Sequence, residues 1–364
     1  MIVVHIISTL NIGGAENVVV QLANKQVEYC KVAIVTLRRT TNDKNYMARL
    51  HSEIEHIELD WKSKYSLNQL WQLNKLINKM APDVIHVHLH NPFYYVFALS
   101  SFKRKIKYIH TVHSSFDNWR KVLAIIHKLR FLNNSILHVT LSPTISKSIQ
   151  KEFPKLRITT VANGIQSHIP HREKEEIKYF WNGFDISPRE GFRFLAIGNI
   201  SGNKNYRLLA LSFKALAKEY PEVMCIQVGS PTDKALTQEL KEINASNVFL
   251  AGPISNAADL LTEADALVIS SVQEGMPIVA LEAMSMGVPI ITTPAGGMPD
   301  IVNTATGLIA NDFEVTSFKS TLTKFIQLSQ NKKRALGTSA RRLFKEKYDI
   351  TIAEEHYKIH YELE

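Results

Sequence analysis

The sequence predicts an α/β protein that consists of two doubly wound domains. The chain has 364 residues. Chains of this length usually fold into more than one domain, each with its own hydrophobic core. Short apolar runs alternate with longer helical patterns, as they do in proteins with parallel sheets. This alternation stops once near the middle of the chain and then starts again, which indicates a second domain.

The two series of strands define the predicted domain boundaries. The first domain is expected to cover residues 1–166, with strands at 2–8, 32–37, 54–59, 84–88, 107–113, 136–141 and 158–161. The second is expected to cover residues 191–345, with strands at 192–198, 223–228, 248–251, 266–270 and 288–293. Helical patterns fill most of the gaps, for example residues 66–80, which Ala81 and Pro82 close.

Two further segments connect or extend these domains. Residues 167–190 mix charge, proline and glycine with little strand character, so they are the expected linker. Residues 346–364 are expected to form a C-terminal helix that packs back towards the first domain. Ligands of open parallel sheets bind beyond the carboxyl ends of the strands, so we expect the functional residues in those loops.

The amino-acid composition indicates a globular protein and limits where it can be located. Hydrophobic residues make up 45% and charged residues 21% of the chain, as in globular proteins with real cores. The start MIVVHIISTL lacks the features of a signal peptide, and no apolar run reaches the ~18 residues of a membrane span. We therefore expect a cytoplasmic protein, in which Cys30 and Cys225 are buried, reduced thiols.

Charge is distributed unevenly along the chain. Residues 1–165 contain 22 Lys and Arg against 10 Asp and Glu, a net charge of +12, whereas the remainder contains 21 against 24, a net of −3. A positively charged domain surface of this kind could bind nucleic acid, an anionic membrane or a phosphate-bearing acceptor. Nucleic acid is disfavoured, because no helix-turn-helix, zinc-finger or RNP-type pattern accompanies the charge.

The basic residues gather around one amphipathic segment. Residues 115–132 place Trp119 and several aliphatic side chains near one side of a helical pattern, with Arg and Lys at its rim. This pattern suits binding at an anionic lipid surface, so residues 103–132 are predicted to dock on a membrane. An ordinary helix that covers the sheet is the alternative.

The strongest local signal is the pair of carboxylates at Glu274 and Glu282, which seven residues separate. The first is expected in a loop after a strand and the second two turns into the following helix. Side chains return to one helical face at this separation, so both could accept hydrogen bonds from sugar and ribose hydroxyls. A solvated glutamate pair is the alternative. The turn at Gly275, the apolar helix and the glycines of residues 295–297 argue against it.

Four segments together resemble the retaining glycosyltransferases of family 4, and the resemblance runs over essentially the whole chain. They are NIGGAENVVVQLA, VANGI, EGMPIVALE and its continuation AMSMGVPIITTPAGGMPDIV. The resemblance implies the GT-B fold, in which two Rossmann-like domains face an interdomain cleft. It also implies a nucleotide-sugar donor.

The resemblance gives these residues roles. It implies that Glu282 binds the donor ribose, that Glu274 lies by the transferred sugar, and that His113 is an active-site histidine near the donor phosphate and sugar. The other donor-binding residues that it implies are Gly14, Asn199, Lys204, Ile254, Gly275, Met276 and Ile278. Gly13 and Glu16 are implied on the acceptor side.

One position departs from the family pattern. Asn199 stands where an Arg for the donor phosphates is expected. A hydrogen bond to a charged group contributes ~1.5–3 kcal/mol, so either the Asn199 amide makes a weaker contact or another basic residue such as Arg207 replaces it.

A metal site is not expected. His86, His88 and His90 alternate along one strand, and on one face they could bind a metal if the strand ran that far. No Asp-x-Asp or Cys accompanies them, so histidines that hydrogen-bond the backbone are favoured. We therefore expect no cofactor and no metal.

The resemblance implies transfer of a hexosyl-type sugar with retention from a UDP- or GDP-sugar to a glycan or lipid-linked acceptor. The acceptor hydroxyl would attack from the side of the leaving group, and the diphosphate would help to take its proton. Bacterial cell-surface polysaccharide assembly, at the inner face of the cytoplasmic membrane, is the expected setting. A nucleotide-sugar 2-epimerase and a non-catalytic nucleotide-sugar-binding protein remain the alternatives.

Overall fold

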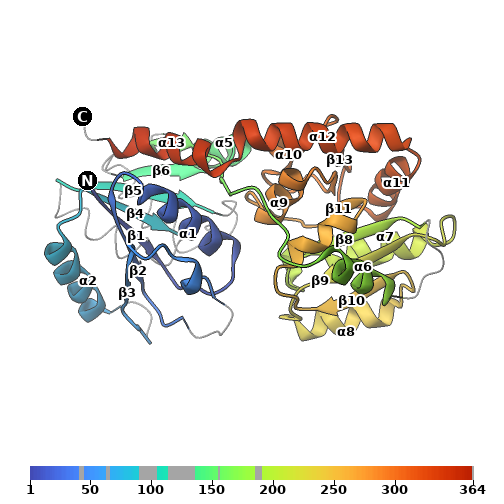
Figure 1. Ribbon diagram of the computed structural model, residues 1–364, viewed down its shortest axis with the longest axis horizontal. Helices are drawn as coiled ribbons and strands as arrows, with labels where there is room; N and C mark the ends of the chain where they lie inside the picture. Colours follow the sequence, from blue (N-terminus) through green and yellow to red (C-terminus); the bar gives the residue numbers. More distant parts are fainter. Residues whose placement is uncertain are drawn as a thin grey trace. The chain divides into compact units, whose positions relative to one another are not determined.

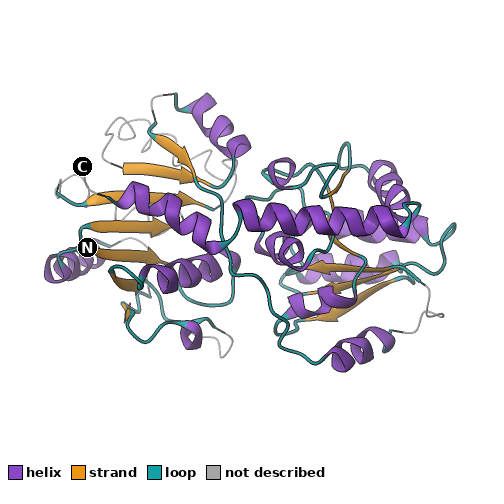
Figure 2. Cartoon of the chain, turned by 45° about the horizontal axis from the view of Figure 1, so that its top comes forward, coloured by secondary structure: helices purple, strands orange, loops and turns teal. Residues whose placement is uncertain are grey.

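The computed structural model describes residues 1–40, 45–62, 66–89, 105–113, 136–154, 156–184 and 191–362. The chain divides into two compact units (Figure 1). Unit 1 comprises Met1–Gln166 and Lys347–Glu364, and unit 2 comprises Ser167–Glu346. Each unit has its own parallel sheet with helices on its faces (Figure 2).

Unit 1 is built on seven strands in the order β3-β2-β1-β4-β5-β6-β7. They are β1 (Ile2–Ile7), β2 (Lys31–Thr36), β3 (Glu55–Glu58), β4 (Val84–His88), β5 (Lys107–Val112), β6 (Ile136–Thr140) and β7 (Ile158–Thr160). The strand order reverses between β1 and β4. In doubly wound sheets, ligands bind beyond the carboxyl ends of the strands at such a reversal.

The helices of unit 1 begin and end at signals in the local sequence. Those among the described residues are α1 (Gly14–Gln26), α2 (Leu67–Met80), α5 (Pro143–Glu152) and α13 (Ile350–Tyr361), with a 3-10 turn η1 (Met47–Arg49). Ser66 and Gln69 form a capping box at the start of α2, and Ala81 ends the helix in the left-handed conformation just before Pro82.

The C-terminal helix α13 belongs to unit 1, where it packs against α1. The segment VANGI lies beside it: the Ile165 N–H donates to the Tyr348 carbonyl oxygen at 3.0 Å. Gly164 is so close to α13 that a Cβ there would lie 2.5 Å from the Cβ of Ala353. The glycine of this motif therefore has a packing function.

Unit 2 is built on six parallel strands in the order β10-β9-β8-β11-β12-β13. They are β8 (Arg193–Ile197), β9 (Met224–Val228), β10 (Val248–Gly252), β11 (Ala266–Ile269), β12 (Ile290–Thr292) and β13 (Gly307–Ile309). Here the order reverses between β8 and β11.

The helices of unit 2 cover both faces of this sheet. They are α6 (Lys174–Asn182), α7 (Tyr206–Leu216), α8 (Lys234–Ile243), α9 (Ile278–Met286), α10 (Met298–Ile301), α11 (Val315–Ile326) and α12 (Gln330–Lys347), with 3-10 segments η3 (Gly202–Lys204) and η4 (Ala257–Glu263). Phe194, Phe213 and Phe325 are fully buried between sheet and helices. Each contributes ~1.5–3 kcal/mol by leaving water.

The strand predictions hold for both units. Each expected strand is present, with ends within two residues of those predicted. The strand β13 (Gly307–Ile309) was not predicted.

The predicted linker is wrong for residues 167–184, which fold as part of unit 2. They contain α6, whose Trp181 is buried and donates its Nε1–H to the Leu260 carbonyl oxygen at 3.2 Å. The buried Asp259 carboxylate also accepts hydrogen bonds from the His168 side chain at 2.7 Å and the Arg172 N–H at 3.1 Å. The local sequence is polar and charged, so it did not indicate a folded segment. The groups that hold it, Asp259 and Leu260, lie far away in the sequence.

The two thiols differ in burial. Cys225 is buried as expected, whereas Cys30 is only half-buried.

Candidate active site

An ion pair lies at the carboxyl edge of the unit 2 sheet, between the loops that follow the neighbouring strands β8 and β11. The Lys204 Nζ donates to Glu274 Oε1 at 2.7 Å, and the Ser271 hydroxyl donates to the same oxygen at 2.6 Å. The Glu274 side chain is only 9% exposed. The pair borders a small pocket, which is lined by Ile197, Lys204, Tyr206, Val268, Ile269, Ser270, Ser271, Glu274, Pro277 and Val279.

Backbone contacts hold Glu274 in place. Gly297 donates its N–H to the Glu274 carbonyl oxygen at 3.1 Å. Gly296 has a positive φ of 51°, and a Cβ there would lie 1.9 Å from the same oxygen. Only glycine meets both demands, so the glycines of residues 295–297 support the backbone beneath the carboxylate.

The loop that contains Lys204 is held by hydrogen bonds from the loop after β11. The Ser270 hydroxyl donates to the Lys204 carbonyl oxygen at 2.9 Å. The Val272 N–H donates to the Asn203 carbonyl oxygen, also at 2.9 Å. The loops after β8 and β11 are thus joined by hydrogen bonds, and this brings a cation and a carboxylate together.

Asn199 and Arg207 were the candidates for the missing phosphate contact. Asn199 Oδ1 accepts the Ser230 N–H at 3.0 Å, so the amide joins the loops after β8 and β9 and leaves Nδ2 as its donor end. Arg207 is 60% exposed and its Nε donates to Glu239 Oε1 at 2.6 Å. The guanidinium is therefore already paired with a carboxylate of α8.

The helical argument for the two glutamates is wrong. The helix α9 begins at Ile278, so Glu274 lies before it and Glu282 lies little more than one turn inside it. The geometry of one helical face therefore does not relate the two carboxylates. Glu282 is half-buried, and its carbonyl oxygen accepts the Ser285 hydroxyl at 2.7 Å.

The remaining predicted donor-binding residues of unit 2 lie in loops at the same edge. Gly275, Met276 and Ile278 are buried between Glu274 and the first turn of α9. Ile254 is half-buried after β10, in a loop whose Gly252 carbonyl oxygen accepts the Gly229 N–H at 2.9 Å.

The Gly13 and Gly14 loop of unit 1 already has a carboxylate over it. Gly13 is the N-cap of α1, and a Cβ there would lie 2.2 Å from Oε2 of Glu16. Burial raises the pKa of this carboxyl group. A helix N-terminus attracts anions, and here the side chain of Glu16 reaches that position.

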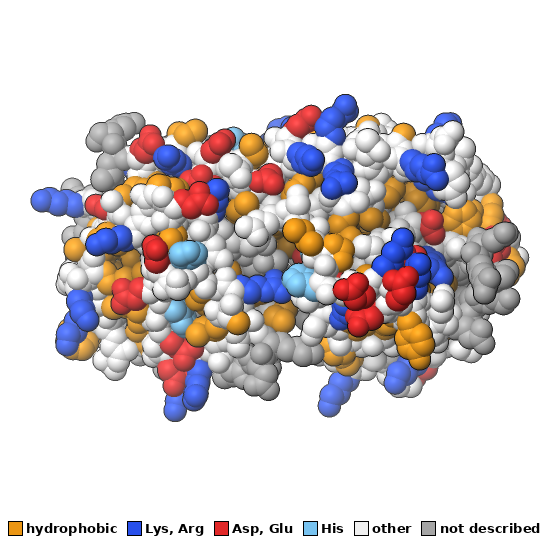
Figure 3. All heavy atoms as spheres, viewed as in Figure 1, with side chains coloured by type: hydrophobic (Ala, Val, Ile, Leu, Met, Phe, Trp, Pro, Cys, Tyr) orange, Lys and Arg blue, Asp and Glu red, His pale blue; other side chains and the backbone are white. Residues whose placement is uncertain are grey.

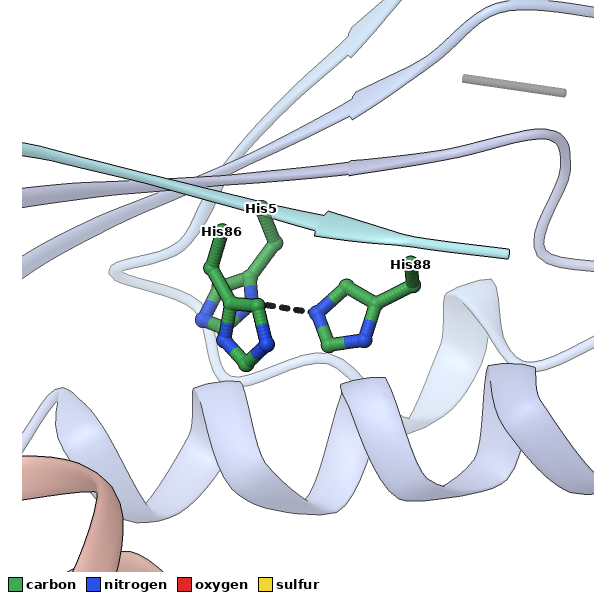
Figure 4. A group of neighbouring side chains, drawn as sticks. All are labelled: His5, His86 and His88. Carbon is green, nitrogen blue, oxygen red and sulfur yellow. Dashed lines mark hydrogen bonds between the residues drawn. The ribbon is translucent and has the colours of Figure 1, made fainter. Parts of the chain in front are cut away.

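Histidines lie side by side on one face of the unit 1 sheet. His5 of β1 is paired in register with His86 of β4, and His88 is paired with Thr111 of β5. Alternation directs these side chains, and His113 two residues after Thr111, to the same face. Figure 4 shows His5, His86 and His88 with their rings close together. His90 lies outside the described residues.

The expected hydrogen bonds to the backbone are wrong for this cluster, because the imidazoles bond to side chains. All six nitrogens of His5, His86 and His88 have such partners, which are Gln26, Thr111, Tyr361, His113 and one another. Burial lowers the pKa of His5 to about 4 and lowers the pKa values of His86 and His88 well below 6.5. The three rings are therefore neutral at pH 7.

Two groups of described residues could hold a metal by residue type and spacing. Nitrogens of His5, His86 and His88 lie within 4.8 Å of one another, and so do ligand atoms of the group His168, His171 and Asp259. In the first group a metal would have to displace existing hydrogen bonds. In the second, Asp259 already accepts from Arg172 as well as His168.

The predicted membrane helix, residues 115–132, lies outside the described residues, as does most of the surrounding segment. On the face shown in Figure 3, Lys and Arg side chains are interspersed with Asp and Glu. Within the described part of the chain, no helix has both the length and the apolar character to span a membrane.

The two units together match two families of known proteins. Residues 12–168 match the family described as Glycosyltransferase Family 4, and residues 191–327 match Glycosyl transferases group 1. Two parallel Rossmann-like sheets are the architecture of the GT-B fold, and solved glycosyltransferases share it. The chain belongs to the glycosyltransferases of family 4.

Relatives and a solved structure agree with this class. The chain is 25% identical over 262 residues to the uncharacterized glycosyltransferase MJ1059 of Methanocaldococcus jannaschii, covering 67% of this chain and 63% of the relative. It is 24% identical over 278 residues to the UDP-Gal:alpha-D-GlcNAc-diphosphoundecaprenol alpha-1,3-galactosyltransferase of Escherichia coli, covering 71% and 70%. Its fold is similar to that of Anabaena Alr3699/HepE in complex with UDP and glucose, with a TM-score of 0.78, 16% identity and coverage of 99% and 98%. The chain spans about three fifths of the length of several curated relatives that it matches.

Sequence reasoning missed three residues of these two networks. Ser271 supports Glu274, and Gln26 and His5 belong to the histidine network. His5 had a signal, because it is a polar residue inside an otherwise apolar strand. Gln26, the last residue of α1, had none.

Proposed function

We propose that this chain transfers a hexosyl-type group from a nucleotide-sugar to a hydroxyl of a glycan or lipid-linked acceptor, with retention of configuration and without a metal. The observation that supports this best is the Lys204–Glu274 pair, held in loops at the carboxyl edge of unit 2. Family membership supports the class of reaction.

Lys204 would bind the donor diphosphate. Its ammonium group has three N–H donors, so it can serve Glu274 and a phosphate oxygen at the same time. A fixed positive charge at this position would stabilise the diphosphate as it departs. The Nδ2 of Asn199 would add a weaker, uncharged contact.

Glu274 would position the transferred sugar. An ionised carboxylate only accepts hydrogen bonds, so its oxygens suit sugar hydroxyls. In the reaction, the acceptor oxygen forms a bond to the anomeric carbon while the bond from that carbon to the diphosphate oxygen breaks. The proton of the acceptor hydroxyl passes to the departing diphosphate, and attack from the same side retains the configuration.

The substrates are proposed from the relatives. The name of the Escherichia coli relative gives a UDP-sugar donor and a lipid-diphosphate acceptor, and the solved Anabaena protein holds UDP and glucose. We therefore propose a UDP-sugar as the first donor to test and a GDP-sugar as the second. We propose the cytoplasmic face of the membrane as the location, in polysaccharide assembly.

A thermal-shift panel with UDP, GDP, ADP and their sugars identifies the donor, because a ligand of the native state raises the apparent stability. Transfer to lipid-linked acceptors is then measured in excess EDTA, and the anomeric configuration of the product is read by NMR. We expect undiminished turnover and a retained configuration. Loss of turnover that a divalent ion restores would overturn the metal-free proposal.

The alternatives give different outcomes in the same assay. An epimerase would convert the donor in the absence of any acceptor. A binding protein would be stabilised by the nucleotide-sugar and would turn over nothing.

A further inference from the structure

A chain of hydrogen bonds runs from Gln26 to His113 through two buried histidines of unit 1. Gln26 Oε1 lies 2.7 Å from His5 Nε2, His5 Nδ1 lies 3.0 Å from His88 Nε2, and His88 Nδ1 lies 3.2 Å from His113 Nε2. The link between His5 and His88 is the dashed line in Figure 4. Gln26, His5 and His88 are at most 1% exposed, whereas His113 is half-buried at the end of β5.

The hydrogen bonds of this series all run in the same direction from donor to acceptor, because the two interior imidazole rings are neutral. Burial holds the pKa values of His5 and His88 well below neutral pH, so each ring has one N–H donor and one acceptor nitrogen. A hydrogen bond needs one donor and one acceptor. Fixing the proton at one end of such a chain therefore fixes it at every link.

Gln26 fixes that end. Its Oε1 can only accept, so His5 must carry its proton on Nε2. His5 Nδ1 is then the acceptor for the Nε2–H of His88. His88 Nδ1 is in turn the acceptor for the Nε2–H of His113.

The orientation of the Gln26 amide decides this direction. Its Oε1 is the atom that lies 2.7 Å from His5 Nε2, and its Nε2 has no hydrogen-bond partner among the described residues. The opposite orientation would place the amide Nε2 against His5 and reverse every donor and acceptor of the series. The tautomers of the histidines therefore report the orientation directly.

We propose that Gln26, His5 and His88 are positioning residues that hold His113 as its Nε2–H tautomer, so that His113 Nδ1 meets the substrate as a hydrogen-bond acceptor. Any group at this nitrogen must then be a donor. An ionised phosphate oxygen cannot donate, whereas a hydroxyl can. The hydrogen-bond series therefore favours a hydroxyl of the sugar or of the acceptor as the partner of His113. This inference rests on the proposed function.

The tautomers can be measured without any activity assay. In protein with ¹⁵N-labelled histidine at neutral pH, long-range proton–nitrogen correlation spectra distinguish the two nitrogens of each ring. Single-residue variants assign the signals. We expect the Nε2–H form for His5, His88 and His113. The Nδ1–H form at any of the three would overturn the proposal.

Variants test the consequence for the reaction. His88→Phe breaks the chain, and the loss of one hydrogen bond at His113 should lower kcat about tenfold while the KM for the donor stays within about twofold. His88→Gln keeps one donor and one acceptor and should restore part of kcat. His138→Phe is the matched control, since His138 is equally buried but faces the other side of the sheet.

The two levels of the proposal fail separately. An unchanged kcat in a folded His88→Phe variant would overturn the role in positioning. If the protein showed no sugar transfer at all, the proposed function would fail. The tautomer spectra would still decide whether the series of hydrogen bonds from Gln26 to His113 exists.

Discussion

The two units differ in the polar groups that lie on and beside their sheets. Unit 1 buries neutral imidazoles that hydrogen-bond one another, and unit 2 holds an ammonium–carboxylate pair. Of the 14 histidines in the chain, only His168 and His171 lie in unit 2. Neutral donors and acceptors suit hydroxyls, whereas a fixed cation suits a diphosphate. In the proposed reaction, unit 1 would therefore contact hydroxyls and unit 2 would contact the donor diphosphate.

Acid should destabilise unit 1 before unit 2, and this is the largest effect that we expect. Burial lowers the pKa of His5 to about 4 and that of His138 to about 3, and it also lowers those of His86 and His88. An unfolded histidine titrates near 6.5. Between that pH and about 4, the unfolded state binds more protons, so the free energy of unfolding falls as the pH falls. Each histidine contributes up to ~1.4 kcal/mol per pH unit in this window.

Hydrogen exchange followed by mass spectrometry checks this at a series of pH values, after correction for the intrinsic exchange rate. Peptides of unit 1 should lose protection at a higher pH than peptides of unit 2. In the His138→Phe variant the slope for unit 1 should be smaller by up to ~1.4 kcal/mol per pH unit. Simultaneous loss of protection in both units would contradict the comparison.

Removal of the cation of unit 2 should have the next largest effect. Lys204→Ala should weaken binding of the nucleoside diphosphate by about 10- to 100-fold, as expected for loss of a charge-assisted hydrogen bond. Calorimetry measures the affinity. Arg207→Ala is the matched control, because Arg207 lies just after Lys204 but pairs with Glu239. Equal losses in both variants would mean that the effect is one of net charge.

The two glutamates should separate binding from turnover, with a smaller effect on affinity. Glu282→Ala should weaken free nucleotide and nucleotide-sugar alike, by about tenfold, through loss of the proposed ribose contact. Glu274→Gln should lower turnover and leave the affinity for free nucleotide nearly unchanged, because the contact proposed for Glu274 is with the sugar. If both variants lost nucleotide equally, this division of roles would be wrong.

Much of the fold could be predicted from local patterns. Runs of apolar residues located the strands except β13, and Ala81 and Pro82 marked the end of α2. The linker prediction failed because Trp181 and the segment after Ser167 are held by groups of η4 far away in the sequence. Local composition contains no information about such distant partners.

The candidate site divides in the same way. By itself, the sequence determined the order of elements, the family motifs and the residue types that could bind a nucleotide-sugar, since these depend on local periodicity and on short spacings. Only the tertiary structure decided that Lys204 pairs with Glu274, that Gly296 supports that carboxylate, and that Gln26 is linked to His113 through His5 and His88. Sheet order and register bring these side chains together, because strands that are distant in the sequence become neighbours only when the sheet forms.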